Sequence, residues 1–535
     1  METINGRGES QLIFTSDLPD IEIPNTDLTT AVLHRVDEKG DAPAIIDGSS
    51  GRELSYLDLR TQIDHFAAGL QQRGFGKGDV MAVFCPNCPE YGVIFLGVAK
   101  VGGINTTVNS LYSSNELEHQ FKDSGARFLI TIPQFLDRAK PAAEAVGIEE
   151  IFVLGEADGC TPFAKLLNND GQVAAVDIDP KKDLVALPYS SGTTGLSKGV
   201  MLTHENLVAN MVLSCEMNEF REDDRMVGVL PFFHIYGMVL ILNLAVYRGV
   251  TLVTMPRFDL QQFLEIVQVY KITSLNLVPP LILALAKQPI VDDYDLSSVR
   301  IIGSGAAPLG PDLEEACAER LKCDIYQGYG LTEVSGASHV NHAPVPPEKR
   351  GSVGPVLPNT ESKVVDTETG EELGPNEKGE VCIRGPHIMP GYLNNEEATR
   401  HCIDEDGWFH SGDIGYADED GYFYIVDRVK ELIKYKGYQV APAELEAILV
   451  SHPAIGDAAV IPSPDEEAGE VPKAFVVLKE EISPEDILAF VAGEVSPHKK
   501  IRLIEIVDEI PKSASGKILR RVLVDQERAR LQSAG

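Results

Sequence analysis

A loop rich in small and hydroxyl-bearing residues carries the clearest chemical signal in this chain. Residues 189–200 read Tyr-Ser-Ser-Gly-Thr-Thr-Gly-Leu-Ser-Lys-Gly-Val and follow an apolar stretch. Small residues allow backbone N–H groups to approach phosphate oxygens, hydroxyl groups add hydrogen-bond donors, and the lysine adds a positive charge. We therefore expect a nucleotide phosphate to bind the loop residues Ser190, Ser191, Gly192, Thr193, Thr194 and Lys198.

This loop differs from the Walker A motif of P-loop enzymes. Gly192, Gly195 and Lys198 lack the Walker A spacing, and Gly199 stands where a serine or threonine would bind magnesium. An ordinary P-loop kinase or ATPase is therefore disfavoured.

Seven further blocks follow the loop along the chain. They are PFFHIYG at 231–237, SGAAPL at 304–309, QGYGLTE at 327–333, WFHSGD at 408–413, YIVDR at 424–428, KELIKYKGYQVAP at 430–442 and PKSASGK at 511–517. The ordered series resembles the adenylate-forming superfamily of acyl-CoA synthetases, peptide-synthetase adenylation domains and firefly luciferase. Within it, the chain most resembles the 4-coumarate/cinnamate:CoA ligases, over nearly its whole length.

The resemblance implies an ATP-dependent carboxylate:CoA ligase. The acid would attack the α-phosphorus of ATP to give an acyl-adenylate and pyrophosphate, and coenzyme A would then displace AMP. Because the first two reactants are anions, catalysis depends on charge neutralisation and positioning. The small molecules expected to bind are therefore ATP, Mg²⁺, coenzyme A and a carboxylic acid.

The resemblance assigns the adenylation chemistry to a few side chains. Lys517 would reach the carboxylate and the α-phosphate, and Glu333 would be the magnesium ligand, as a hard oxygen donor suits that cation. Asp413 would accept the ribose hydroxyls beside Arg428. The other residues assigned to ATP or AMP are Gly305, Ala306, Gln327, Gly328, Tyr329 and Thr332.

For thioester formation, the resemblance implies rotation of a small C-terminal domain about a hinge at Lys430. Rotation would bring Lys434 to the active site, and Gln439 would join the nucleotide-side cluster. The residues assigned to coenzyme A are Arg257, Lys436 and Gly437.

The acyl pocket is expected to be apolar. His234 would gate this pocket, and the residues assigned to its lining are Tyr236, Val239, Gly303, Gly330, Gly336 and Ala337. Plant 4-coumarate ligases carry polar groups where this chain has Gly303 and Val239, so a ring hydroxyl should be rewarded weakly. We expect a cinnamate-like aryl acid, with a medium-chain fatty acid as the alternative.

Other classes are less consistent with the sequence. No carboxylate occurs at 231–237 to pair with the ammonium group of an amino acid, which disfavours a peptide-synthetase domain. A luciferase-like monooxygenase shares the adenylation step and stays open as a minor alternative. A non-catalytic binding protein is disfavoured because Lys517, Glu333 and the phosphate loop are all present.

Charge and composition limit the partners and the compartment that are expected for this chain. The net charge of −35 disfavours nucleic acid and anionic membranes as partners. No apolar run is long enough to span a membrane, and the N-terminus lacks the features of a signal peptide, so we expect a cytoplasmic protein. Sites for anionic ligands must then be locally basic, and the C-terminal basic residues are expected to supply that charge. These are Lys499, Lys500, Arg502, Lys512, Lys517, Arg520 and Arg521.

With 535 residues, the chain exceeds the ~250–300 residues at which single cores stop growing. Short apolar runs alternate with helical patterns up to about residue 350, which predicts layered α/β sheets. Strands are expected at 81–86, 127–132, 150–155, 185–190, 226–231, 251–256 and 299–304. From Ser352, short strands and frequent turns predict a small β-rich subdomain. We therefore expect a large α/β domain at 1–428 and a small mobile α+β domain at 429–535.

Overall fold

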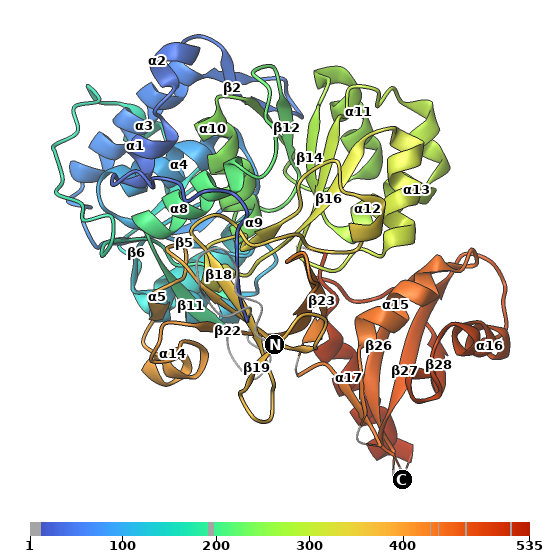
Figure 1. Ribbon diagram of the computed structural model, residues 1–535. Helices are drawn as coiled ribbons and strands as arrows, with labels where there is room; N and C mark the ends of the chain where they lie inside the picture. The colour runs from blue at the N-terminus through green and yellow to red at the C-terminus, as the bar shows by residue number, and fades with distance from the viewer. Residues whose placement is uncertain are drawn as a thin grey trace.

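The computed structural model describes residues 12–190, 197–428, 430–436, 438–465, 468–513 and 516–534. Strands within these residues form four sheets, three before residue 429 and one after it. Figure 1 shows the C-terminal part, in orange and red, as a smaller body beside the larger one. A large layered α/β part, a β-rich part and a small α+β part confirm the expected fold class.

An eight-stranded sheet has the order β17-β16-β15-β14-β12-β13-β2-β3, and its strands from β16 to β2 are parallel. Its strands are β2 (Pro43–Asp47), β3 (Glu53–Ser55), β12 (Arg225–Gly228), β13 (Thr251–Thr254), β14 (Ser274–Leu277), β15 (Ile301–Ser304), β16 (Asp324–Tyr329) and β17 (His339–Val340). Helices α11 (Leu260–Tyr270), α12 (Pro279–Lys287) and α13 (Pro311–Leu321) lie beside it (Figure 1). Ligand sites in such sheets form at the carboxyl ends of the parallel strands.

A nine-stranded sheet carries the phosphate-loop region. Its order is β10-β11-β9-β5-β4-β6-β7-β8, with β21 paired to β11. Its strands are β4 (Val80–Phe84), β5 (Ile104–Thr107), β6 (Ala126–Thr131), β7 (Glu150–Val153), β8 (Thr161–Pro162), β9 (Leu184–Ala186), β10 (Tyr189–Ser190), β11 (Lys198–Thr203) and β21 (Gly391–Tyr392). The N-terminal helices are α1 (Leu28–Val32), α2 (Val36–Lys39), α3 (Tyr56–Gln71), α4 (Pro89–Lys100), α5 (Ser114–Ser124), α6 (Leu136–Val146), α7 (Ala164–Leu167) and α8 (His204–Cys215).

The remaining two sheets are mostly antiparallel. The six-stranded sheet contains β1 (Ile13–Thr15), β18 (Glu361–Val365), β19 (Glu372–Leu373), β20 (Gly379–Arg384), β22 (Phe409–Ala417) and β23 (Phe423–Arg428), with α14 (Glu396–Cys402) nearby. The C-terminal sheet contains β24 (Ile433–Tyr435), β25 (Tyr438–Val440), β26 (Ile455–Asp465), β27 (Gly469–Leu478) and β28 (Leu503–Ile506). Its helices are α15 (Pro442–Ser451), α16 (Pro484–Glu494) and α17 (Arg520–Ala534).

Local sequence explains where key elements begin. Ser55 and Asp58 form a capping box that starts α3. Thr203 likewise accepts a hydrogen bond from the backbone N–H of Asn206 at the start of α8. Residues from Lys198 to Thr203 form β11, an antiparallel strand that returns beside β10 before the helix begins.

The hydrophobic core is divided between the two bodies. One large cluster joins the parallel sheets and includes Phe66, Phe95 and Phe232. A separate cluster lies wholly after residue 430 and includes Ile433 and Val476. The C-terminal part therefore has a hydrophobic core of its own, and a small cluster of Ile414, Leu432 and Ala441 joins it to the larger body.

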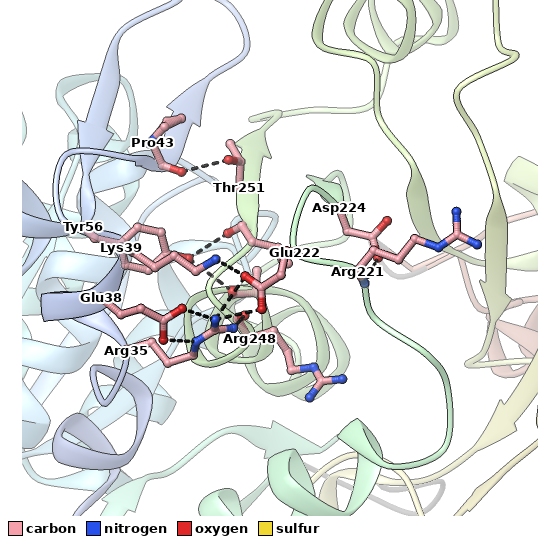
Figure 2. A network of polar contacts seen from close by, with 12 residues as sticks. Arg35, Glu38, Lys39, Pro43, Tyr56, Arg221, Glu222, Asp224, Arg248 and Thr251 are labelled. Atoms are coloured by element: carbon pink, nitrogen blue, oxygen red, sulfur yellow. Dashed lines mark hydrogen bonds and ion pairs between the residues drawn. The ribbon is translucent and has the colours of Figure 1, made fainter.

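A polar network fixes the end of the large parallel sheet that faces away from the strands' carboxyl ends (Figure 2). The Glu222 carboxylate accepts hydrogen bonds from Arg35, at 2.9 Å, and from Lys39. Arg35 also donates to the Arg248 carbonyl at 2.6 Å. These contacts tie α2 to the segments that lead into β12 and β13, so this end of the sheet is braced while the other end carries the site.

Several of the C-terminal basic residues form ion pairs with carboxylates of their own body. Lys499 forms an ion pair with Glu444, and Lys512 with Asp457. Arg520 bridges the carboxylates of Glu431 and Glu446. Carboxylates of the same body thus pair with these three residues, while Lys512, Lys517 and Arg520 also line the large cavity described below, so the expected basic contribution to the site comes from part of this group.

Within the described part of the chain, no helix is both long enough and apolar enough to cross a membrane.

Candidate active site

A cavity of about 2240 Å³ lies where the two bodies meet the carboxyl ends of the parallel strands. Its walls come from the segments after β15 and β16, from β22 and β23, and from residues 512–520 of the C-terminal body. Residues expected to act in adenylation and residues expected to bind the acyl group both line this one cavity.

One end of the cavity holds a buried carboxylate with two partners. The Tyr329 hydroxyl donates to Asp413 Oδ2 at 2.7 Å, and Arg428 Nε lies 3.1 Å from Asp413 Oδ1. Antiparallel pairing of β22 with β23 places Asp413 opposite Arg428. Burial raises the pKa of Asp413, while the Arg428 charge and the tyrosine hydrogen bond oppose that rise. This geometry can hold a vicinal diol, since its acceptor is fixed and charge-balanced.

Lys517 enters the same end from the C-terminal body. Its loop packs against the large body, because a Cβ on the neighbouring Gly516 would lie 3.0 Å from Val278 Cγ2. Burial lowers the pKa of Lys517; the Arg428 charge adds to this effect, and the Glu431 and Asp413 charges oppose it. The structure thus brings Lys517 and Asp413, far apart in sequence, to one site.

His234 lies at the junction between the two ends of the cavity. Its Nδ1 accepts a hydrogen bond from the Tyr236 backbone N–H at 3.3 Å, so Nε2 carries the proton of a neutral ring. Burial, with a smaller effect of the Lys517 charge, lowers the pKa of His234 to about 4. The ring is therefore uncharged at neutral pH and lines the cavity.

Glu333 is the carboxylate best placed for a divalent cation. Its Oε1 accepts hydrogen bonds from Ser190 Oγ at 2.9 Å and from the Tyr392 hydroxyl at 2.8 Å. Among the described residues, Oε2 has no such partner. A buried carboxylate with one free oxygen, next to a serine hydroxyl and the phosphate loop, has the hard donors that Mg²⁺ prefers.

The phosphate loop is described only at its two edges. Ser190 and Lys198 both line the cavity, and the Lys198 ammonium lies 4.7 Å from the centre of the Tyr392 ring. Ser191, Gly192, Thr193 and Thr194 lie outside the described residues.

Gln327 was expected to contact the nucleotide, but its side chain does not line the cavity. Its amide donates to the Leu309 carbonyl at 3.0 Å and to Glu314 at 2.9 Å, and its Oε1 accepts from the Leu309 N–H. Buried hydrogen bonds occupy the side chain, so Gln327 braces the 305–309 loop instead of touching a nucleotide. The other assigned nucleotide residues line the cavity: Gly305, Ala306, Gly328, Tyr329 and Thr332.

The other end of the cavity contains residues that were assigned to the acyl pocket. Tyr236, Gly330, Gly336 and Ala337 line it as expected. Small residues are required here: a Cβ on Gly330 would lie 1.7 Å from the Gly336 carbonyl oxygen. Val239 was a wrong assignment, because its side chain is 1% exposed and packs into the core. The next residue on that helical segment, Leu240, lines the cavity in its place.

Gly303 was also wrongly assigned to the lining. The Tyr326 side chain covers it, and a Cβ on Gly303 would lie 2.7 Å from the Tyr326 hydroxyl. Tyr326 and Asn276 do line the cavity, and sequence reasoning missed both. For Asn276, the available signal was a polar residue between two leucines of β14, whereas β16, which reads DIYQGY, gave no such contrast for Tyr326.

The residues assigned to thioester formation lie elsewhere in this conformation. Lys434 and Lys436 are exposed on the β24–β25 hairpin, and neither lines the cavity of the described chain. Arg257 is exposed after β13, whereas Lys430, the residue expected to be the hinge, lines the cavity. Gly437 and the side chain of Gln439 lie outside what the structure describes.

A profile described as AMP-binding enzyme matches residues 32–393, and one described as AMP-binding enzyme C-terminal domain matches residues 444–517. A 4-coumarate--CoA ligase of Pinus taeda is 46% identical over 533 residues, covering 97% of this chain and 98% of the relative. A 4-coumarate--CoA ligase of Petroselinum crispum is 45% identical, covering 98% of each chain.

Solved structures agree with these sequence relatives. An anthranilate CoA ligase in complex with anthranoyl-AMP has a TM-score of 0.88 at 27% identity, covering 95% of this chain and 98% of the other. ATP-bound MatB from Rhodopseudomonas palustris has a TM-score of 0.85 at 28% identity, covering 94% and 99%.

Proposed function

This chain belongs to the AMP-binding enzyme family, and from that premise we propose its acid substrate and the residues that act on it. It is an AMP-forming acid:CoA ligase, which couples ATP cleavage to thioester formation through an acyl-adenylate. The substrate that we propose is an aryl acid of the cinnamate and 4-coumarate type. The observation that carries this proposal is the 46% identity to a 4-coumarate--CoA ligase over nearly the full length of both chains.

Adenylation is proposed to use the conformation described here. Asp413 and Tyr329 bind the ribose, and the Lys517 ammonium neutralises charge between the carboxylate and the α-phosphate. The support is the burial of Lys517 near Asp413 and His234. A fixed positive charge in a site that excludes water stabilises the charge that develops during phosphoryl transfer. Glu333 would hold Mg²⁺, which would neutralise the phosphate oxygens when bound.

Thioester formation is proposed to follow a rotation of the C-terminal body about Lys430. Support comes from the exposed Lys434 and Lys436, which have no role in the cavity of this conformation, and from the separate C-terminal core. Gln439 and Gly437 would move with this hairpin toward the cavity, and Arg257 would contact coenzyme A from the large body. Lys436→Ala should then preserve ATP–pyrophosphate exchange while lowering coenzyme A transfer, and a collapse of exchange would contradict this assignment.

The compartment is proposed to be cytoplasmic. All eight cysteines are free, four of them buried, and no pair is joined by a disulfide. Reduced thiols of this kind are typical of a reducing compartment.

ATP–pyrophosphate exchange with a panel of acids tests the substrate proposal. Cinnamate and 4-coumarate should support exchange at kcat/KM values at least tenfold above those of medium-chain fatty acids. Higher values for the fatty acids would replace the aryl acid by the alternative substrate class. Light emission with luciferin, ATP and oxygen would instead support the monooxygenase alternative.

A further inference from the structure

Three adjacent parallel strands place two polar side chains on either side of a glycine. In the register of β14, β15 and β16, Asn276 pairs with Gly303, and Gly303 pairs with Tyr326. Residues paired in this way point to the same face of a sheet. The row Asn276–Gly303–Tyr326 therefore places an amide and a phenol on one face of the sheet. Between them lies a gap, because Gly303 has no side chain.

The gap is what brings the two polar groups together. A Cβ on Gly303 would lie 2.7 Å from the Tyr326 hydroxyl oxygen and 2.9 Å from Asn276 Oδ1. Both oxygens thus surround one point, so their separation cannot exceed the sum of those two distances. The absence of a side chain at Gly303 lets the tyrosine lie across the middle strand toward the asparagine.

Neither polar group is used by the protein itself. Among the described residues, no hydrogen bond is formed by the Asn276 amide or the Tyr326 hydroxyl, although Asn276 is only 7% exposed. Both side chains line the cavity. Their polar atoms therefore reach the cavity, where a ligand can form hydrogen bonds with them.

The row lies at the inner end of the acyl pocket. Tyr236 packs at 2.9 Å from the Cβ position of Gly305, and its hydroxyl lies 3.4 Å from the Gly303 carbonyl oxygen. Gly305 directly follows β15 and lies nearer to the nucleotide end, whereas Gly303 lies within β15. An acid whose carboxylate faces Lys517 would therefore extend past Tyr236 with its distal end toward Asn276 and Tyr326.

We propose that Asn276 and Tyr326 form a polar subsite that binds a hydrogen-bonding substituent at the distal end of the acid, such as the 4-hydroxyl of 4-coumarate. This inference rests on the proposed function. It replaces the expectation of an apolar pocket, which followed from Val239 and Gly303.

The two side chains supply complementary groups. Burial raises the pKa of Tyr326 to about 12, so its hydroxyl stays protonated and can donate. The Asn276 amide offers an acceptor and a donor, whichever way it is oriented. A ring hydroxyl could accept from one side chain and donate to the other, whereas an unsubstituted ring would leave both unpaired.

The ratio of kcat/KM for 4-coumarate to that for cinnamate tests the subsite. Wild type should prefer 4-coumarate by about tenfold or more, because a site built for a hydroxyl rejects the analogue that lacks it. Tyr326→Phe and Asn276→Leu should each lower that ratio at least threefold, mainly through 4-coumarate, with cinnamate changed less than about threefold. Tyr294→Phe makes the same chemical change away from the cavity and should leave the ratio unchanged.

Two results would overturn the proposal. One is a wild-type ratio at or below one, and the other is an unchanged ratio in both Tyr326→Phe and Asn276→Leu. Asn276→Met replaces Asn276→Leu if the latter does not fold.

Failure of the proposed function would look different. If medium-chain acids are adenylated and the aryl acids are not, the substrate class is wrong, and the same ratio is measured between an ω-hydroxy acid and its parent. A preference for the hydroxy acid that Tyr326→Phe reduces would still support the subsite, and its absence would reject it.

Discussion

The two ends of the cavity are built on different principles. At the nucleotide end, Asp413, Tyr329 and Arg428 are already joined to one another, and Lys517 completes the cluster. At the acyl end, Asn276 and Tyr326 have polar groups that no described residue satisfies, and glycines set the shape. One end is preorganised for a fixed, highly charged ligand, whereas the other leaves its hydrogen bonds to the acid.

This contrast predicts where substitutions act. Changes at the nucleotide end should affect every acid equally, because every reaction passes through the same adenylate chemistry. Changes at the acyl end should alter the choice between acids and leave the use of ATP intact.

Lys517→Ala should have the largest effect. Loss of this buried charge should reduce ATP–pyrophosphate exchange about a thousandfold for every acid. Coenzyme A transfer from a supplied acyl-adenylate should be largely retained, because Lys517 would face the site only during adenylation. Lys479→Ala, an exposed lysine of the same body, is the control. Equal losses in both half-reactions would contradict the two-conformation assignment.

Asp413→Asn should come next. The substitution removes the charge that pairs with Arg428, so kcat/KM for ATP should fall roughly 30-fold, as for a hydrogen bond to a charged group. The 4-coumarate to cinnamate ratio should stay within twofold of the wild-type value. Asp420→Asn removes an exposed carboxylate outside the cavity and serves as control. A shift in acid preference would show that the two ends are not separable.

Gly303→Ala should act at the acyl end alone. The new methyl group would collide with the Tyr326 hydroxyl, so kcat/KM for 4-coumarate should fall about fivefold at an unchanged KM for ATP. Combining it with Tyr326→Gly should remove the collision, so Gly303→Ala should cost little in that background. Additive losses in the double-mutant cycle would mean that the two residues do not interact.

The smallest effect is expected for the contribution of His234, at the junction of the two ends, to the pH dependence of kcat/KM. Burial holds the pKa of His234 at about 4, below its unfolded value, so the ring is neutral between pH 6 and 8. The rate of His234→Gln can differ from wild type, but both should show the same pH dependence of kcat/KM across this range. A change in the kcat/KM of wild type with a midpoint near pH 6.5 that is absent in the variant would show that the ring titrates during turnover.

The nucleotide end could be predicted from sequence far better than the acyl end. Asp413, Tyr329 and Arg428 each sit in a short block with a recognisable order, and the structure brings them together as expected. Gln327 lies in such a block too, yet its side chain turns into the protein, because Leu309 and Glu314 supply partners there. A motif indicates which backbone passes the site and does not decide which way every side chain points.

The sequence by itself determined the fold class, the reaction and the charged residues of adenylation, because these depend on local patterns and on residue types with few substitutes. Tertiary structure alone decided the acyl end. Asn276, Gly303 and Tyr326 become neighbours only through the register of three strands that are separated by helices in the chain. Whether a pocket is apolar depends on which side chains cross such a gap, and the packing of Tyr326 over Gly303 cannot be obtained from either residue alone.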